Sequence, residues 1–351
     1  MKKILFVGGG SAGHVVPNVA LIERLLRTGK TDVCYMGTDG IEKSLVSSLH
    51  IPFYQIDCPK LVRGGGFSAL KNNMTIPAKF KKAVEQATKG LRAFSPDLVF
   101  SKGGYVSLPV VWAAHKLSIP CITHESDYSL GLSNKLMAKK CELVLTAFPE
   151  TAKKLKNGKY VGQPIRKSLF SASKHGAKID YCEGTKKPVV LVLGGGKGSV
   201  TVNQAIRKDL KTLCDRYFLL HVCGKGNIVD CSVKDYRQFE YVENIGDLYA
   251  AADVVVSRAG AGATFEALAL KKPTVLIPLA KQTRGDQLEN ARYFERRGLC
   301  KVLQENELDD LAQAIEKALL DEDMKEALAV SRYGEGTANT LYQISRLLYA
   351  K

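Results

Sequence analysis

The sequence of 351 residues has no apolar run near the ~18 residues that a membrane-spanning helix needs. Its first apolar stretch is broken at Gly8–Gly10, too early for the core of a signal peptide, so we expect a buried first strand in a cytoplasmic protein. The nine cysteines never form a Cys-x-x-Cys pair, which argues against a zinc ribbon, a thioredoxin motif or a disulfide framework. We expect free thiols in a reducing compartment.

Acidic residues are scarce in the first half of the chain. Residues 1–160 contain 23 Lys and Arg but 11 Asp and Glu, whereas residues 161–351 contain 28 and 24. Most of the formal net charge of +16 therefore belongs to the first half, which predicts an anionic partner such as a phosphate-bearing substrate, an acidic membrane surface or nucleic acid. A nucleic-acid binder is disfavoured because no recognised nucleic-acid-binding module accompanies this charge.

The chain contains a rough internal repeat. Lys3–Gly10 and Pro188–Gly196 are each an apolar run ending in three glycines, which is typical of a buried parallel strand followed by a tight turn. A helical pattern follows each run; the second includes Val202 to Leu213. Further strands alternate with helices in both halves, at residues 97–100, 120–123, 143–146, 253–257 and 274–278.

This alternation predicts two doubly wound, Rossmann-like α/β domains. We place the first domain at residues 1–162 and the second at 163–336, with a final helix at about 337–351 that packs back on the first domain. Ligands of such sheets bind beyond the carboxyl ends of the strands, so we expect the site in a cleft between two facing domains.

The first glycine loop, Gly8-x-Gly10-x-x-Gly13, matches the dinucleotide-binding fingerprint. An NAD enzyme would need an acid about 20 residues further on, but Asp32 comes too early and Asp39 too late. A tight turn that binds no ligand explains the same glycine pattern equally well. His14 follows the loop, where it can take a proton, contact a phosphate or be a polar residue at a helix start.

Three segments of the second half carry further candidates. Gly194–Ser199 is a possible phosphate loop, but Lys197 is followed by Gly, which disfavours an ATPase. In Arg258–Glu266 we expect Thr264 to cap a helix and Glu266 to bind ribose hydroxyls, or to lie in the first helical turn as a dipole partner. Gln287 and Asn290 share a helix face that either binds sugar hydroxyls or is solvated.

Seven ordered motifs together resemble the bacterial MurG family, over nearly the whole chain: Gly9–Pro17, Gly103–Ser107, His124–Asp127, Gly131–Lys135, Gly162–Arg166, Ala251–Gly260 and Asp286–Ala291. The resemblance implies the two-domain GT-B glycosyltransferase fold. It also implies transfer of N-acetylglucosamine from UDP-N-acetylglucosamine to the muramoyl 4-hydroxyl of undecaprenyl-pyrophosphoryl-muramoyl-pentapeptide (lipid I), which gives lipid II. The alternative is another GT-B UDP-sugar transferase with a glycolipid or natural-product acceptor.

The resemblance also carries binding residues. Gly10, Gly103, Gly104 and Tyr105 match the cradle for the acceptor diphosphate. The positions matching the binding site for UDP-N-acetylglucosamine are Ser11, Ala12, Gly13, Asp127, Arg166, Gly196, Ile245, Ala261, Gly262, Ala263, Thr264, Phe265, Glu266 and Gln287. The chain departs from the family where Ser126 and Asp127 replace a frequent Gln and Asn, and where Gly196 replaces a frequent Ser.

The implied chemistry is an inverting displacement of UDP from the anomeric carbon. We expect His14 to be the base that deprotonates the acceptor hydroxyl, with Glu125 as the second choice. Helix N-termini and Arg166 would stabilise the departing diphosphate. No Asp-x-Asp metal motif is evident among the candidate site segments, and the resemblance implies neither a metal nor another cofactor.

Residues 60–92 suggest a contact with a membrane. This segment has eight basic residues and one acid, Glu85, interleaved with bulky apolar residues. A basic helix with its apolar side in the core explains the pattern equally well. Because the implied acceptor is a lipid, we expect peripheral attachment to the anionic inner leaflet, at the cytoplasmic face of the cell membrane.

Overall fold

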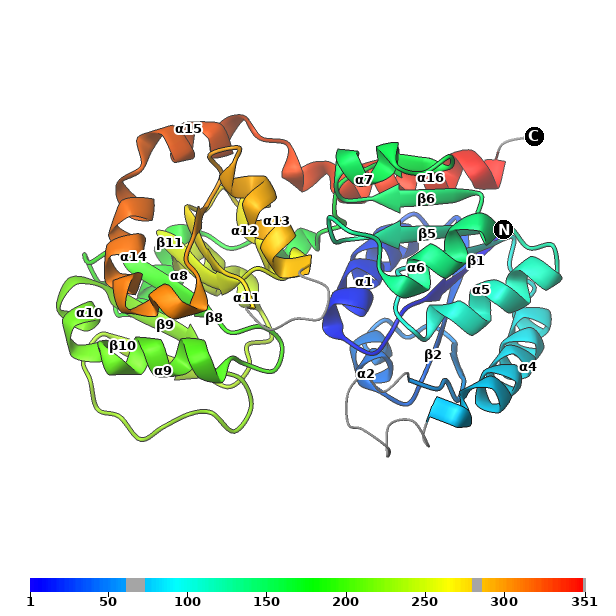
Figure 1. The fold of residues 1–351 in the computed structure, drawn as a ribbon, viewed down its shortest axis with the longest axis horizontal. Coiled ribbons are helices and arrows are strands. Elements are labelled where there is room, and N and C mark those ends of the chain that lie inside the picture. Colours follow the sequence, from blue (N-terminus) through cyan, green and yellow to red (C-terminus); the bar gives the residue numbers. More distant parts are fainter. Residues whose placement is uncertain (61–72, 280–285, 350–351) are drawn as a thin grey trace. The chain divides into compact units, whose positions relative to one another are not determined.

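The computed structural model describes residues 1–60, 73–279 and 286–349 (Figure 1). The chain forms two compact units, which are taken one at a time. The first unit is Met1–Arg166 together with the chain from Glu335 onward, and the second is Lys167–Gly334. Each unit contains one parallel sheet with helices, so the predicted α/β fold class is confirmed.

The sheet of the first unit has the strand order β3-β2-β1-β4-β5-β6-β7, and every neighbouring pair is parallel. The order runs outward from β1 in one direction and then from β4 in the other, as in Rossmann-type folds. The predicted strands at 97–100, 120–123 and 143–146 correspond to β4, β5 and β6. The strands are β1 Lys2–Val7, β2 Thr31–Gly37, β3 Phe53–Gln55, β4 Leu98–Ser101, β5 Cys121–Glu125, β6 Leu143–Thr146 and β7 Gly158–Tyr160.

Helices cover both faces of this sheet, which explains why β1 is apolar at successive positions. Ile4 and Phe6 belong to a core with residues of α1 and α16, whereas Leu5 and Val7 belong to a core with residues of α4 and α5. Helix α16 therefore contributes to the core of the first unit. The helices of this unit are α1 Ala12–Leu26, α2 Ile41–Ser47, α4 Ile76–Phe94, α5 Ser107–Lys116, α6 Leu132–Met137, α7 Pro149–Lys153 and α16 Gly336–Tyr349.

The sheet of the second unit repeats the same plan, with the order β10-β9-β8-β11-β12-β13 and parallel neighbours. The predicted strands at 253–257 and 274–278 correspond to β11 and β12. The strands are β8 Val189–Leu193, β9 Phe218–Val222, β10 Tyr236–Phe239, β11 Val254–Arg258, β12 Thr274–Ile277 and β13 Lys301–Val302.

The helices of the second unit correct one prediction. The apolar pattern from Val202 to Leu213 does not form one helix, because the chain breaks at Asp209 into α9 and α10. Both helices keep apolar residues of this pattern buried, so the amphipathic pattern continues across the break. The helices are α8 Lys174–Cys182, α9 Val200–Lys208, α10 Leu210–Arg216, α11 Ile245–Ala251, α12 Ala261–Ala269, α13 Asp286–Glu295, α14 Leu311–Leu320 and α15 Glu322–Val330.

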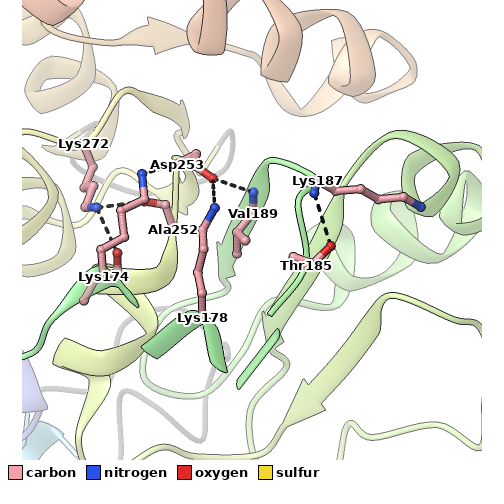
Figure 2. Close-up of polar contacts among 9 residues, drawn as sticks. Lys174, Lys178, Thr185, Lys187, Val189, Ala252, Asp253 and Lys272 are labelled. Atoms are coloured by element: carbon pink, nitrogen blue, oxygen red, sulfur yellow. Dashed lines mark hydrogen bonds and ion pairs between the residues drawn. The ribbon is translucent and has the colours of Figure 1, made fainter. Parts of the chain in front are cut away.

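A charge cluster around Asp253 connects the amino ends of β8 and β11 through hydrogen bonds (Figure 2). The carboxylate accepts hydrogen bonds from the Val189 amide (2.9 Å) and from the ammonium groups of Lys174 (2.5 Å) and Lys178 (3.0 Å). Lys272 donates instead to the Ala252 carbonyl, at 2.8 Å. Burial alone would raise the pKa of Asp253, but these hydrogen bonds outweigh it and lower the pKa. The cluster lies at the amino end of the strands, so its role in this unit is structural.

The strand order fixes where each unit can bind a ligand. In open α/β sheets a crevice forms beyond the carboxyl ends of the two strands between which the order reverses. In the first unit these strands are β1 and β4, and in the second they are β8 and β11. The loops after β1 and β8 are the candidate phosphate loops of the sequence, and the loops after β4 and β11 carry residues that the family resemblance assigns to diphosphates.

Candidate functional site

The two glycine loops of the first unit contact each other at the carboxyl ends of β1 and β4. Gly104 has a φ of +80°, and a Cβ there would lie 2.8 Å from the Gly9 carbonyl oxygen and 3.2 Å from Nδ1 of His14. A Cβ on Gly10 would clash with the ring of Tyr105. Both positions therefore need glycine. The structure brings together residues that lie about ninety positions apart in the sequence.

Two amides that the sequence assigns to the acceptor diphosphate are already engaged. The Gly10 amide donates to Oε2 of Glu42 at 3.2 Å, and the Gly103 amide donates to Oγ of Ser101 at 3.0 Å. Glu42 is fully buried, and its other oxygen accepts from the Thr38 amide at 2.9 Å. The amides of Gly10 and Gly103 therefore already have acceptors within the protein, and the binding of the acceptor diphosphate by this loop stays a prediction. Sequence reasoning missed Glu42, because nothing in the pattern distinguishes it from a surface acid of α2.

His14 lies in the first turn of α1, directly after the glycine loop. Its Nδ1 is 2.9 Å from Oγ of Ser11, the residue before the helix. When Nδ1 carries the hydrogen and Ser11 accepts it, Nε2 has a lone pair that can accept a proton. His14 is half-buried and Ser11 is exposed, so both residues lie at the edge of the loop.

Glu125, the second candidate base, is held by four donors. Oε1 accepts from the amides of Ser126 (2.9 Å) and Asp127 (3.1 Å), and Oε2 accepts from the Gly131 amide and Nδ2 of Asn134, both at 2.8 Å. Both carboxylate oxygens therefore already have hydrogen-bond donors within the protein. The arrangement instead anchors the loop that carries Asp127, whose side chain is half-buried.

Lys102 is a buried cation that sequence reasoning did not single out. It follows β4 directly, its side chain is 1% exposed, and its Nζ is 2.9 Å from Nδ1 of His124 and in contact with Oγ of Ser126. Burial lowers the pKa of Lys102 to about 8, against the attraction of Glu125 and Asp127. A lysine directly before two glycines at a strand end is the signal that was available in the sequence.

In the second unit, the loop after β8 leaves room at the position where the family often has serine. A Cβ on Gly196 would have no atom within 4 Å, and the residue is exposed. The next helix is capped by Ser199, whose Oγ accepts from the Val202 amide (3.3 Å) and from Nε of Arg258 (3.0 Å). Buried Arg258 also pairs with Glu305 at 2.6 Å, so it ties this loop to the end of β11.

The start of α12 is an open helix N-terminus. Gly260 precedes it, no side chain caps it, and its first turn holds no acid. A Cβ on Gly260 or Gly262 would meet nothing within 4 Å, so the space beside Ala261–Ala263 is open. Free amides and a positive dipole end make such a terminus suitable for a diphosphate.

The side chains after this turn correct one sequence expectation, and one of them belongs to the core. Thr264 does not cap the helix, because α12 already begins at Ala261 and Thr264 is buried inside it. Phe265 is fully buried, with its ring centroid 5.3 Å from that of Phe294 and 5.8 Å from that of Tyr333. Its side chain belongs to the core and cannot contact a nucleotide.

Glu266 lies in the second turn of α12, so the expectation of a first-turn dipole partner is wrong. Its Oε2 accepts a hydrogen bond from the hydroxyl of Tyr249 at 3.4 Å. Tyr249 is fully buried on α11, the helix that begins with half-buried Ile245. One tyrosine therefore connects the two helices that carry the expected uracil and ribose contacts.

On α13 the two expected amides differ. Asn290 is fully buried and donates to the Ala259 carbonyl at 3.5 Å, so it is not available for a sugar. Gln287 is half-buried, and its Oε1 accepts a hydrogen bond from the Leu279 amide at 3.2 Å. This bond uses the side-chain oxygen of Gln287 and not its NH₂ group. Arg284 and Gly285, the start of this motif, lie outside the described residues. Arg166, the residue before the chain enters the second unit, is half-buried.

No cluster of three or more His, Cys, Asp or Glu side chains that could hold a metal ion occurs within residues 1–60, 73–279 and 286–349.

Two domain families match the chain. The N-terminal domain of glycosyltransferase family 28 matches residues 4–146, and the C-terminal domain of the same family matches residues 189–340. A protein of Clostridium botulinum (strain Langeland), named UDP-N-acetylglucosamine–N-acetylmuramyl-(pentapeptide) pyrophosphoryl-undecaprenol N-acetylglucosamine transferase, is 45% identical over 318 residues, or 88% of each chain.

Solved structures share the fold at lower identity. MurG of Acinetobacter baumannii superimposes with a TM-score of 0.73 and 24% identity, over 99% of this chain and 100% of that one. The glycosyltransferase of kitacinnamycin superimposes with a TM-score of 0.75 and 17% identity, over 98% of both chains. At these identities the two solved structures show the fold that the chain shares with them, and not its substrates.

Proposed function

The chain belongs to the MurG family within glycosyltransferase family 28, and from this premise we propose that it transfers N-acetylglucosamine from UDP-N-acetylglucosamine to the muramoyl 4-hydroxyl of lipid I, giving lipid II. It is a UDP-N-acetylglucosamine-dependent hexosyltransferase of the GT-B fold. The observation that carries the proposal is the 45% identity over 88% of the chain to an enzyme named for this reaction.

The donor is held mainly by the second unit. The uncapped N-terminus of α12, with Ala261, Gly262 and Ala263, receives the diphosphate, because its free amides carry partial positive charge. Glu266 accepts hydrogen bonds from the ribose hydroxyls, and Ile245 packs on the uracil. This arrangement is supported by the hydrogen bond from Tyr249, which fixes Glu266 relative to the helix of Ile245.

The transfer is a direct displacement with inversion at the anomeric carbon. His14 takes the proton of the acceptor hydroxyl through Nε2, while Ser11 orients its ring through Nδ1. The departing UDP is stabilised by the amides of α12 and by Arg166. Glu125 is proposed here as the anchor of the loop that carries Asp127 rather than as the base, since four donors already occupy its carboxylate.

The acceptor diphosphate is proposed to bind at the start of α1. Because the amides of Gly10 and Gly103 have acceptors within the protein, the amides of Ser11–Gly13 are better placed, at a helix end that no side chain caps. The engaged amide of Gly10 also disfavours an NAD enzyme, which would need it for the pyrophosphate of the dinucleotide.

A lipid acceptor requires the protein to reach a membrane surface, and within the described residues no helix is long and apolar enough to span one. We place the contact on α4 and α5. Phe80 packs edge-on against Trp112 at 6.1 Å, Nζ of Lys140 lies 4.2 Å from the Trp112 ring, and Met74 is 76% exposed. Apolar side chains among lysines are typical of peripheral attachment to the anionic cytoplasmic leaflet. The remaining residues of the basic and apolar segment, Leu61, Val62, Arg63, Phe67, Leu70 and Lys71, lie outside the described residues.

The function is tested by a transfer assay with radiolabelled UDP-N-acetylglucosamine and a soluble lipid I analogue. Labelled disaccharide product is expected, and UDP-N-acetylglucosamine should bind in calorimetry while NADH does not. Absence of product with lipid I analogue but transfer to another glycolipid would assign the enzyme to a different acceptor. Binding of NADH in place of the UDP-sugar would overturn the proposal.

A further inference from the structure

The buried ammonium of Lys102 is the donor at the head of a polar network in the first unit. Nε2 of His124 lies 2.9 Å from the Gly162 carbonyl oxygen, which only accepts, so Nε2 carries the hydrogen. Nδ1 of His124 must then accept from Lys102, at 2.9 Å. Burial and the nearby Lys102 lower the pKa of His124 well below its usual value, which keeps the ring neutral.

The same ammonium fixes the loop after β5. Its second acceptor is Oγ of Ser126, and this hydroxyl donates in turn to Oε1 of Gln163 at 2.8 Å. Glu125 holds the loop through the backbone amides of residues 126 and 127, so Lys102 adds the side-chain attachment. The Ser126 hydroxyl therefore links Lys102 to Gln163, and Asp127 lies one residue further along the same loop.

The charge of Lys102 is not explained by packing. Both carboxylate oxygens of Glu125 accept from N–H groups of its own loop, and the opposite charges that favour the ammonium are Glu125 and Asp127. A buried cation costs stability, and apolar residues of similar volume in such positions are often neutral or stabilising. The lowered pKa of Lys102 is the sign of this cost. A role of the Lys102 charge in ligand binding explains why a residue with this cost in stability occupies the position.

We propose that Lys102 is a positioning residue for the sugar of the nucleotide-sugar donor: it holds the loop of Ser126 and Asp127 in place and compensates the negative charge of Asp127 beside the sugar. The inference rests on the proposed function in one respect, that Asp127 contacts the donor sugar. An uncompensated carboxylate there would repel the donor diphosphate, whereas a compensated one can accept hydrogen bonds from sugar hydroxyls.

The test compares binding of UDP-N-acetylglucosamine with binding of UDP, both by calorimetry without acceptor. Lys102→Met should weaken binding of the UDP-sugar about tenfold or more while UDP affinity and Tm are kept, because UDP lacks the sugar. Asp127→Asn removes the charge at similar size. In the Lys102→Met background it should recover part of the lost affinity, so the two changes are less than additive.

Lys272→Met is the matched control, since it removes a partly buried lysine of the second unit that donates to the Ala252 carbonyl (Figure 2). It should leave both affinities unchanged. Ser126→Ala tests the same attachment if Lys102→Met does not fold, and should weaken the UDP-sugar but not UDP. Unchanged UDP-sugar affinity in both variants overturns the inference, and so does an equal loss for UDP and UDP-sugar. Failure of the wild type to bind UDP-N-acetylglucosamine would overturn the proposed function itself.

Discussion

Nδ1 of His14 lies 2.9 Å from Oγ of Ser11 at the first turn of α1, and we propose these two residues as the base and its orienting partner. We expect His14→Ala to lower kcat by roughly 100-fold or more, the usual worth of a general base. Ser11→Ala should lower kcat about fivefold, the worth of one hydrogen bond of about 1 kcal/mol. UDP affinity, measured by calorimetry, should stay the same in both. Near-normal turnover of His14→Ala would remove His14 from the mechanism.

The carboxylate of Glu266 is proposed to bind the ribose, which UDP and the UDP-sugar share. Glu266→Ala should therefore weaken both by about 2 kcal/mol, a roughly 30-fold rise in Kd. Tyr249→Phe removes the hydroxyl that orients this carboxylate and should have a smaller effect in the same direction. Glu326→Ala, at an exposed acid of α15, is the control. Equal UDP affinity in wild type and Glu266→Ala would show that the ribose is held elsewhere.

Gly196 lies in open space, whereas its neighbour Gly195 has a φ of +89°. A serine at 196 is therefore unstrained and adds a hydroxyl beside the expected diphosphate. Gly196→Ser should tighten UDP binding by about 1 kcal/mol, or roughly fivefold, without lowering Tm. Gly195→Ser is the matched control and should lower Tm, because side chains disfavour positive φ. Unchanged or weaker UDP binding in Gly196→Ser would place the diphosphate away from this loop.

Lys272 should make the stability of the second unit depend on pH. Burial, together with the nearby Lys174 and Lys178 and against the attraction of Asp253, lowers the pKa of Lys272 from 10.5 to about 8. Below pH 8 the lysine is charged in both states, and the folded state bears the full cost. Between pH 8 and 10.5 the unfolded state binds more protons, so the free energy of unfolding rises with pH by up to ~1.4 kcal/mol per unit. Above pH 10.5 that cost is gone.

This rise is measured as a difference between variants, since other groups also titrate. The free energy of unfolding from urea titrations of wild type minus that of Lys272→Met should increase from pH 8 to pH 10. The same difference for Lys211→Met, at an exposed lysine of α10, should stay flat. A flat curve for Lys272→Met would show that its ammonium is not disfavoured by burial.

The membrane contact predicts binding to vesicles that contain anionic lipid but not to purely zwitterionic ones, and weaker binding at high salt. Lys79, Lys81 and Lys89 are exposed on α4, whereas Lys82 pairs with Asp57 at 3.1 Å and is better left in place. Replacing the first three by Glu should release the protein from vesicles, with UDP affinity unchanged. Sedimentation with vesicles as strong as for the wild type would move the membrane contact to another surface.

The sequence predicts the two parallel sheets because apolar strand runs and glycine turns are local signals. It also predicts His14 and Glu266 at loop and helix positions near strand ends. It misjudges Thr264 and Asn290, because a motif shows which residues occur together and not which side of a helix meets the core. Lys102 and Glu42 escape it for a related reason: each acquires its role from partners in other elements, and those contacts exist only in the folded chain.

The carboxylate of Glu42 beneath the first glycine loop has a consequence for ligand stoichiometry. Each unit carries a glycine-rich turn after its first strand. In the first unit the buried carboxylate of Glu42 accepts a hydrogen bond from the amide of Gly10 in this turn. The amide of Gly10 already donates to Glu42, whereas a diphosphate approaching Gly196 would meet open space. We therefore expect a soluble nucleotide to bind with a stoichiometry of one per chain, and an inhibitor that mimics UDP to have one binding site rather than two.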